Sequence, residues 1–317
     1  MLRRLIGSVA VVLGAVLTLA VTTAPAGAAS VRPDGDSPGF YYGIDSSGPT
    51  VGGGAPYNVP YVQPAYPARL GGYVGEVGSW ARWQGCPTTL FYNATDYAAA
   101  NANYYRYHLG VGSSVYWMLG GPGVDPATPG RTPTVDQAYA WGAAQAKRTL
   151  DDIAVAHLSI PRKFIVMDVE LPGVAPATDN GWNHIYPGKC GGSPVANYVS
   201  PTVDRAVFNG YYAYVLAHSS YAIVVYSGPG SGAWDGIFGT GAQGMIPNTY
   251  EWTYLAETPS VSTGPQGWCA GGTCARFFGG QTSANAHAFM WQWSGGGGIR
   301  NGHGDYDQID TARLPRR

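Results

Sequence analysis

Short apolar runs bounded by glycine, proline and polar residues recur along this chain, and helical patterns separate several of them. Runs of about four to eight residues that are rich in β-branched or aromatic side chains favour strands over helices. We therefore expect strands at residues 40–45, 69–77, 113–119, 163–170, 222–226, 249–257, 286–293 and 306–309.

Helical patterns lie between several of these runs. Residues 134–157 carry the clearest one, because apolar side chains recur close to every 3.6 residues and Thr134 precedes them as an N-cap. Residues 201–219 begin with a proline, which suits the first position of a helix. Residues 96–108 have helical composition, and residues 230–238 could hold a short helix.

The order of these elements predicts the fold class. Strands and helices alternate through the first five units, and the last three strands follow with little helix between them. Alternation of this kind indicates a parallel sheet, and eight strands suggest that the sheet closes. We predict an α/β fold of the TIM-barrel type, five βα units followed by three strands, as a single domain over residues 39–317.

The run at residues 163–170, KFIVMDVE, ends in two carboxylates, Asp168 and Glu170. Alternate residues of a strand share a face, so both acids point the same way with alpha carbons about 6.6 Å apart. A strand that is apolar on both faces is usually buried and parallel, and α/β barrels carry their chemistry at the carboxyl ends of such strands. The alternative for any single Asp-x-Glu is a strand end that caps a loop or pairs with arginine.

The amino terminus reads as an export signal. A pair of arginines precedes apolar residues 5–21, and Ala-Gly-Ala follows at residues 26–28. This pattern predicts a signal peptide over residues 1–28 and a polar leader over residues 29–38, with an uncleaved anchor as the alternative. No later segment has about 18 consecutive apolar residues, so we expect a secreted protein without a membrane segment after cleavage.

Composition narrows the choice of ligand. The chain is 12% charged with a formal net charge of −1, and no cluster of lysine and arginine stands out. These values argue against a nucleic-acid binder. The 23 tyrosines and 10 tryptophans suit a protein that meets neutral polar ligands such as sugars.

The four cysteines all follow the predicted signal peptide. An even count in an exported chain predicts two disulfides, and we favour Cys269–Cys274 together with Cys86–Cys190. A zinc site is the rival interpretation. His184, His287 and His303 have no partner spacing for a metal site, and we expect neither a metal nor another cofactor.

Acids and aromatic residues gather at the ends of the predicted strands. The acids are Asp45, Glu76, Asp168, Glu170 and Asp307. The aromatic residues in or near the same ends are Tyr116, Trp117, Tyr226, Trp252, Tyr254, Trp291 and Trp293. In a barrel these ends meet at one rim, where several acids beside aromatic platforms would describe a sugar cleft. Glycoside hydrolysis typically needs one protonated carboxylic acid and one ionised carboxylate or a substitute for it, and crowding of acids supplies both protonation states. Aromatic residues in strands can equally be core.

Five motifs occur in a fixed order: Gly43-Ile44-Asp45-Ser46-Ser47, Asp168-Val169-Glu170, Val225-Tyr226-Ser227, Trp252-Thr253-Tyr254-Leu255-Ala256, and Trp291-Gln292-Trp293-Ser294 followed by Asp305-Tyr306-Asp307. Over about residues 39–312 the chain resembles the glycoside hydrolase family 25 lysozymes and the related glycoside-hydrolase-like domains of secreted bacterial proteins, the "domain of unknown function 1906" group. The resemblance implies a barrel of five βα units plus three strands, in agreement with the pattern.

The resemblance also implies an activity, cleavage of the muramic acid to glucosamine bond of peptidoglycan. Glu170 would be the general acid, and Asp168 would orient the N-acetyl group of the substrate or stabilise the charged intermediate. Asp45 and Asp307 would complete the acidic cleft, although Asp310 competes with Asp307 for that position. The expected substrate-binding residues are Tyr226, Trp252, Trp117 and Trp291.

A non-catalytic protein that binds cell-wall glycan on the same barrel is the alternative function. The glycine- and tyrosine-rich residues 48–67 and the insertion at residues 171–200 motivate it, because they could block or reshape the cleft. In either case we expect a monomer whose partner is peptidoglycan or another cell-wall glycan.

Overall fold

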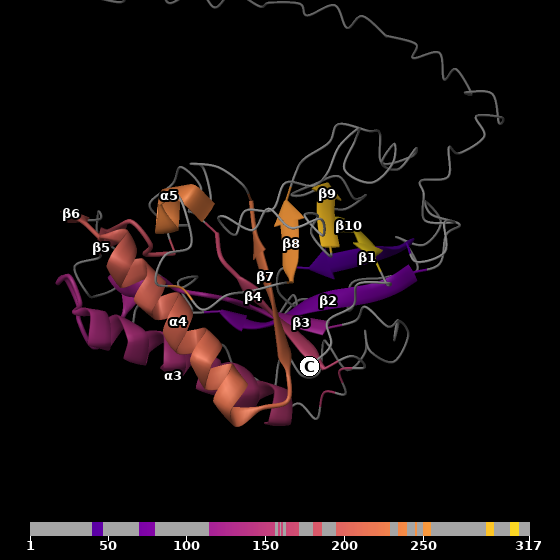
Figure 1. Ribbon diagram of the computed structural model, residues 1–317, viewed down its shortest axis with the longest axis horizontal. Coiled ribbons are helices and arrows are strands. Elements are labelled where there is room, and N and C mark those ends of the chain that lie inside the picture. The colour runs from indigo at the N-terminus through magenta and orange to yellow at the C-terminus, as the bar shows by residue number, and fades with distance from the viewer. Residues whose placement is uncertain are drawn as a thin grey trace, which may run out of the picture. The chain divides into compact units, whose positions relative to one another are not determined.

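The computed structural model describes residues 40–46, 70–79, 114–155, 163–170, 180–185, 195–228, 234–239, 250–254, 290–294 and 305–310, with Leu158, Ile160 and Met245 (Figure 1). Within this part of the chain, no helix is long and apolar enough to cross a membrane. The predicted signal peptide and leader, the helix expected at residues 96–108 and all four cysteines lie outside the described residues, so those predictions stay predictions.

Eight strands close into a barrel in the order β1, β10, β9, β8, β7, β4, β3, β2. Their bounds are β1 (Phe40–Ser46), β2 (Leu70–Ser79), β3 (Ser114–Met118), β4 (Phe164–Asp168), β7 (Ala222–Ser227), β8 (Glu251–Tyr254), β9 (Met290–Ser294) and β10 (Asp305–Asp310). Neighbouring strands are parallel except β10, which is antiparallel to both β1 and β9. The predicted α/β barrel is confirmed, but the sheet is mostly parallel and not wholly parallel as expected, because the last strand is reversed.

The described helices connect the middle strands of the barrel. They are η3 (Pro122–Val124) and α3 (Val135–Val155) after β3, α4 (Pro201–His218) after β4, and α5 (Trp234–Phe238) after β7. Helices α3 and α4 pack side by side (Figure 1). Three of the five expected βα units are therefore visible, and the connections after β1 and β2 lie outside the described residues. The insertion predicted at residues 171–200 contains a separate antiparallel pair, β5 (His184–Ile185) and β6 (Val195–Tyr198).

Strand β4 is apolar on both faces because it separates two clusters of buried side chains. Phe164 and Val166 belong to the cluster inside the barrel, the inner cluster. The members of the inner cluster are Val74, Tyr116, Phe164, Val166, Ala222, Val224, Tyr226, Trp252, Met290 and Ile309. Ile165, Met167 and Val169 belong to the outer cluster, which contains the buried faces of α3, α4 and α5. The alternation predicted for this strand is thus confirmed.

Helix α3 begins with a capping box. The Thr134 hydroxyl accepts a hydrogen bond from the Gln137 backbone N–H (3.2 Å), and the Gln137 side chain accepts one from the Thr134 N–H (2.9 Å). The predicted N-cap is therefore confirmed. The buried stripe of the helix includes the polar residues Gln145, Thr149 and Asp152, which a search for apolar residues passes over.

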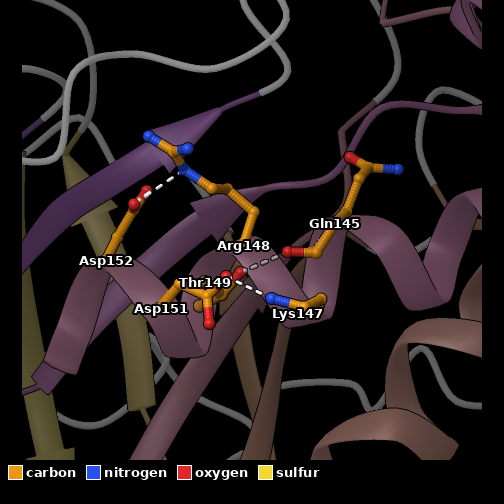
Figure 2. Close-up of polar contacts among 6 residues, drawn as sticks. All are labelled: Gln145, Lys147, Arg148, Thr149, Asp151 and Asp152. Carbon is orange, nitrogen blue, oxygen red and sulfur yellow. Dashed lines mark hydrogen bonds and ion pairs between the residues drawn. The ribbon is translucent and has the colours of Figure 1, made fainter. Parts of the chain in front are cut away.

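Two ion pairs lie along α3, as Figure 2 shows. Lys147 and Asp151 form an exposed pair at 2.6 Å, whereas the Arg148 guanidinium reaches the buried carboxylate of Asp152 at 2.7 Å. Burial raises the pKa of Asp152 to about 6 even though the charge of Arg148 opposes the shift. The buried pair is therefore held together against a cost of desolvation, and the exposed pair contributes little to stability.

Asp204, in the first turn of α4, is fully buried. Neither carboxylate oxygen of Asp204 forms a hydrogen bond to the part of the chain that the structure describes. Desolvation raises the pKa of this carboxyl well above its ordinary value of 3.8. The folded protein therefore holds a proton on Asp204 at pH values where the unfolded chain has released it, and the stability that this proton supports is lost as the pH rises toward the folded pKa.

Substitution Asp204→Asn should make the protein more stable than the parent at neutral and alkaline pH. The gain in the free energy of unfolding should grow from about pH 4 upward, because the amide mimics the neutral acid and does not ionise. Urea unfolding of both proteins between about pH 4 and pH 8 measures the difference in their free energies of unfolding. Asp152 also titrates in this range, but its contribution is the same in both proteins and cancels in the difference. Asp136→Asn, the same change at an exposed acid in the first turn of α3, is the control. A constant difference across this range would contradict the assignment.

Candidate active site

The two acids of the Asp-x-Glu motif stand where β4 ends. Asp168 is the last residue of the strand and pairs with Met118 of β3 and Tyr226 of β7. Its carbonyl accepts a hydrogen bond from the Leu119 N–H (2.9 Å), and it is only 6% exposed. Glu170 follows beyond the strand end and is half-buried. Because Val169 between them packs into the outer cluster, alternation puts both acids on the inner face of the barrel.

A row of paired residues crosses the barrel wall at the level of Asp168. The register joins Asp168 to Tyr226, Tyr226 to Trp252, and Trp252 to Met290. The rings of Tyr226 and Trp252 meet edge to face, with centroids 4.6 Å apart. Both side chains belong to the inner cluster, so inside the barrel Tyr226 stands beside the acid of β4 and Trp252 stands beside Tyr226.

Asp307 lies on β10, the strand next to β9 in the barrel. It is fully buried, and its carboxylate accepts a hydrogen bond from the Trp252 indole N–H (3.0 Å). The side-chain oxygen of Gln292, on β9, accepts a hydrogen bond from the Tyr226 hydroxyl. Asp168, Tyr226, Trp252, Gln292 and Asp307 therefore form one inner polar group, in which β4, β7, β8, β9 and β10 each supply a residue.

Removal of the indole donor should destabilise this group. We expect Trp252→Phe to lower the free energy of unfolding by about 1–3 kcal/mol more than a matched tryptophan substitution, because a buried acceptor on Asp307 loses a partner. Trp182→Phe is the match, since Trp182 is also fully buried and its indole nitrogen forms no hydrogen bond within the described residues. Urea unfolding measures both variants. Equal losses would show that the bond to Asp307 contributes nothing to stability.

The other two predicted tryptophans lie elsewhere. Trp117 is fully buried in the outer cluster, and its indole N–H donates to the Gln145 side chain (3.3 Å). Trp291 is fully buried too, and it alternates with Met290 of the inner cluster, so it faces outward. The structure does not bring these two residues together with the inner polar group.

Strand register locates the remaining acids. Asp45 is paired with Asp305 and Val74, and Gly43 on the same strand is paired with Asp307. Asp310 is paired with Phe40, at the amino end of β1, which is the opposite end of the barrel from the acids of β4. Of the two candidates on β10, Asp307 is therefore the one that lies with the inner polar group.

The sequence analysis did not assign a role to Gln292. The sequence does carry a signal for it: Gln292 is a polar residue between Trp291 and Trp293, and it lies two positions after Met290, on the same face of the strand. No set of three or more histidine, cysteine, aspartate or glutamate residues in the described ranges could hold a metal ion. The inner polar group offers carboxyl groups, which can exchange protons, and an amide, a phenol and an indole, which can form hydrogen bonds with sugar hydroxyls.

No protein-family model matches the chain, and neither does any curated protein. The chain is similar to the spore cortex lytic enzyme SleM of Clostridium perfringens, with a TM-score of 0.48 at 13% identity over 86% of this chain and 68% of that one. It is also similar to the CTP1L endolysin (TM-score 0.41, 12% identity, 85% and 66% covered) and to a muramidase from Trichobolus zukalii (TM-score 0.41, 13% identity, 85% and 93% covered). Likeness this distant assigns the chain to no family.

Proposed function

We propose that the protein is a secreted glycoside hydrolase of the lysozyme type, an N-acetylmuramidase that cleaves the glycan of peptidoglycan. The observation that carries the proposal is the position of Asp168 and Glu170, at the carboxyl end of a barrel strand and on the same face as Tyr226, Trp252 and Asp307. The ordered motifs that resemble family 25 lysozymes support the same assignment.

In this proposal Glu170 is the general acid. Its carboxyl group protonates the oxygen of the leaving sugar while the bond from that oxygen to C1 of the muramic acid residue breaks. The N-acetyl carbonyl oxygen of the substrate forms the new bond to C1, and Asp168 orients that N-acetyl group and stabilises the positive charge that develops on it. Water then attacks C1, releases the N-acetyl oxygen and returns its proton to the Glu170 carboxylate.

The lower exposure of Asp168 gives it a different environment from Glu170. Asp168 is 6% exposed within the paired strands, whereas Glu170 is half-buried beyond them. A carboxyl at the strand end can reach a glycosidic oxygen in the mouth of the barrel, and a carboxyl one row deeper can contact a group that hangs below the sugar ring. The division of roles between the two acids follows from this difference in depth.

The test is incubation of the purified protein with purified peptidoglycan, followed by reduction and identification of the new reducing ends. A muramidase releases fragments that end in reducing muramic acid, whereas a glucosaminidase releases reducing glucosamine ends. Reducing muramic acid ends that accumulate with time are the expected result. Their absence, under conditions in which a reference muramidase solubilises the same walls, would refute the proposal.

Glycan binding without cleavage is the second candidate, and the burial of Asp307 favours it. Asp307 is fully buried and its carboxylate accepts the Trp252 indole N–H, so this predicted acid has no direct access to a reacting sugar. Co-sedimentation with the same peptidoglycan separates the two candidates. Binding without any new reducing ends would establish the non-catalytic alternative.

A further inference from the structure

The loop that follows β3 is fastened to helix α3 by buried hydrogen bonds. The Gln145 side chain, which is fully buried, accepts from the Gly120 N–H (2.8 Å) and donates to the Gly120 carbonyl (2.9 Å). The Trp141 indole N–H lies 3.0 Å from the carbonyl oxygens of both Gly120 and Gly121. Both hydrogen-bonding groups of the Gly120 residue are thus held by a helix that packs in the outer cluster, which fixes this loop next to the end of β4.

The fastened loop in turn holds the segment that begins at Asn180. The Gly121 N–H donates to the Asn180 carbonyl (2.7 Å), and the Gly123 N–H donates to the Gly181 carbonyl (2.8 Å). A Cβ atom on Gly121 would stand 2.5 Å from the Gly181 oxygen. The two backbones therefore touch with no room for a side chain between them, and Asn180 cannot shift independently of the loop after β3.

Asn180 is the residue through which this support reaches the candidate acid. Its side-chain amide donates a hydrogen bond to the backbone carbonyl of Glu170 (3.3 Å), and Asn180 is only 8% exposed. Glu170 needs such support because it lies beyond β4, whose pairing with β7 reaches as far as the bond from the Val169 N–H to the Tyr226 carbonyl (2.9 Å). A side chain points where its backbone directs it, so a bond to the Glu170 carbonyl affects the direction of the carboxyl group.

We infer that Asn180 is a positioning residue, which holds the Glu170 backbone so that the carboxyl group points into the barrel mouth. The inference rests on the proposed function insofar as Glu170 is the acid of the reaction. The structural part, that the Asn180 amide fixes the Glu170 peptide, stands apart from any activity. The direction of the Glu170 carboxyl group matters for glycoside cleavage, because displacement of a reacting group by about 1 Å can lower the rate roughly 100-fold.

The experiment compares Asn180→Ala with Asn183→Ala, the same change in the same segment. The Asn183 side-chain oxygen forms no hydrogen bond within the described residues, which makes it a matched control. Two quantities are measured on each protein: kcat and KM for release of muramic acid ends from soluble peptidoglycan fragments, and the carbon-13 chemical shift of the Glu170 backbone carbonyl. The second measurement reports the hydrogen bond whether or not the protein has activity.

We expect Asn180→Ala to lower kcat about tenfold or more with KM nearly unchanged, because the acid is misdirected and substrate contacts are kept. The Glu170 carbonyl resonance should shift in this variant and not in Asn183→Ala. Asn180→Asp adds a rescue: its protonated carboxylic acid can donate to the Glu170 carbonyl and its carboxylate cannot, so its kcat relative to the parent should recover as the pH falls.

The outcomes separate the inference from the proposed function. A parent that releases no glycan, with the Glu170 resonance shifted in Asn180→Ala alone, refutes the muramidase and retains Asn180 as the support of Glu170. An active parent whose two alanine variants have the same kcat and unmoved Glu170 resonances overturns the inference and retains the muramidase. A raised KM at constant kcat in Asn180→Ala would also overturn it, because that result would place Asn180 in substrate binding.

Discussion

Substitution Glu170→Gln should lower peptidoglycan cleavage by roughly 100-fold to 10,000-fold, the usual contribution of a general acid. The amide has nearly the shape of the carboxyl group and cannot transfer a proton to the leaving oxygen. Because Glu170 is half-buried and lies beyond β4, its replacement should leave the fold and the affinity for cell walls close to those of the parent. Rates of release of reducing muramic acid ends, together with co-sedimentation, measure the two properties separately.

Asp151→Asn is the control for this substitution, because it replaces an exposed acid on α3 and should leave the rate unchanged. Asp168→Asn should also lower the rate, because Asp168 is assigned to orient the N-acetyl group that forms the bond to C1. Cleavage by Glu170→Gln at the rate of the parent would remove Glu170 from the role of acid. Equal losses in Glu170→Gln and Asp151→Asn would indicate general instability of the variants.

Substitution Gly210→Ala should lower the free energy of unfolding by about 3 kcal/mol or more, at or beyond the upper end of the usual overpacking cost. A Cβ atom at this position of α4 would stand 2.0 Å from the carbonyl oxygen of Tyr139 on α3. The obstacle is backbone, which cannot rotate aside, so the helices would have to separate. The crossing is reciprocal, since a Cβ atom on Gly142 of α3 would stand 1.9 Å from the Val207 carbonyl oxygen of α4.

Alanine would otherwise favour this helix by about 0.8–1.0 kcal/mol relative to glycine, so intrinsic propensity predicts the opposite sign. Ala144→Gly, at an exposed interior position of α3, measures that propensity in the partner helix and is the control. The double substitution Gly142→Ala with Gly210→Ala should cost less than the sum of the two, because one separation of the helices relieves both contacts. Urea unfolding measures the free energy of unfolding of each variant. A Gly210→Ala protein more stable than the parent would refute the tight crossing of α3 and α4.

The alternation in residues 163–170 was sufficient to predict the layering around β4. A strand has a period of two, so a run with apolar residues on both faces must separate two apolar layers, and the inner and outer clusters are those layers. The same reasoning put Asp168 and Glu170 on one face and at a carboxyl end. For α3, the apolar period predicted the helix, and Thr134 predicted its N-cap. The buried stripe of the helix also contains Gln145, Thr149 and Asp152, which an apolar pattern does not reveal because they are polar.

The hydrophobic pattern did not show which side chains of the other strands point into the barrel. Trp117 and Trp252 are both aromatic residues near strand ends, yet Trp117 packs in the outer cluster and Trp252 in the inner one. Which face of a strand turns inward depends on its register with its neighbours, and β10 shows the limit most clearly. Its sequence does not reveal that it runs antiparallel between β1 and β9, and only that pairing brings Asp307 beside Gln292 and places Asp310 at the far end.

Local patterns were therefore enough to predict the alternating strands, the capped helix α3, and a pair of acids on one face. They could not predict which distant residues meet, because contacts such as Trp252 with Asp307 and Asn180 with Glu170 depend on closure of the barrel and on the loop after β3. Periodicity encodes the direction of a side chain relative to its own backbone. It does not encode the neighbour toward which that side chain is turned.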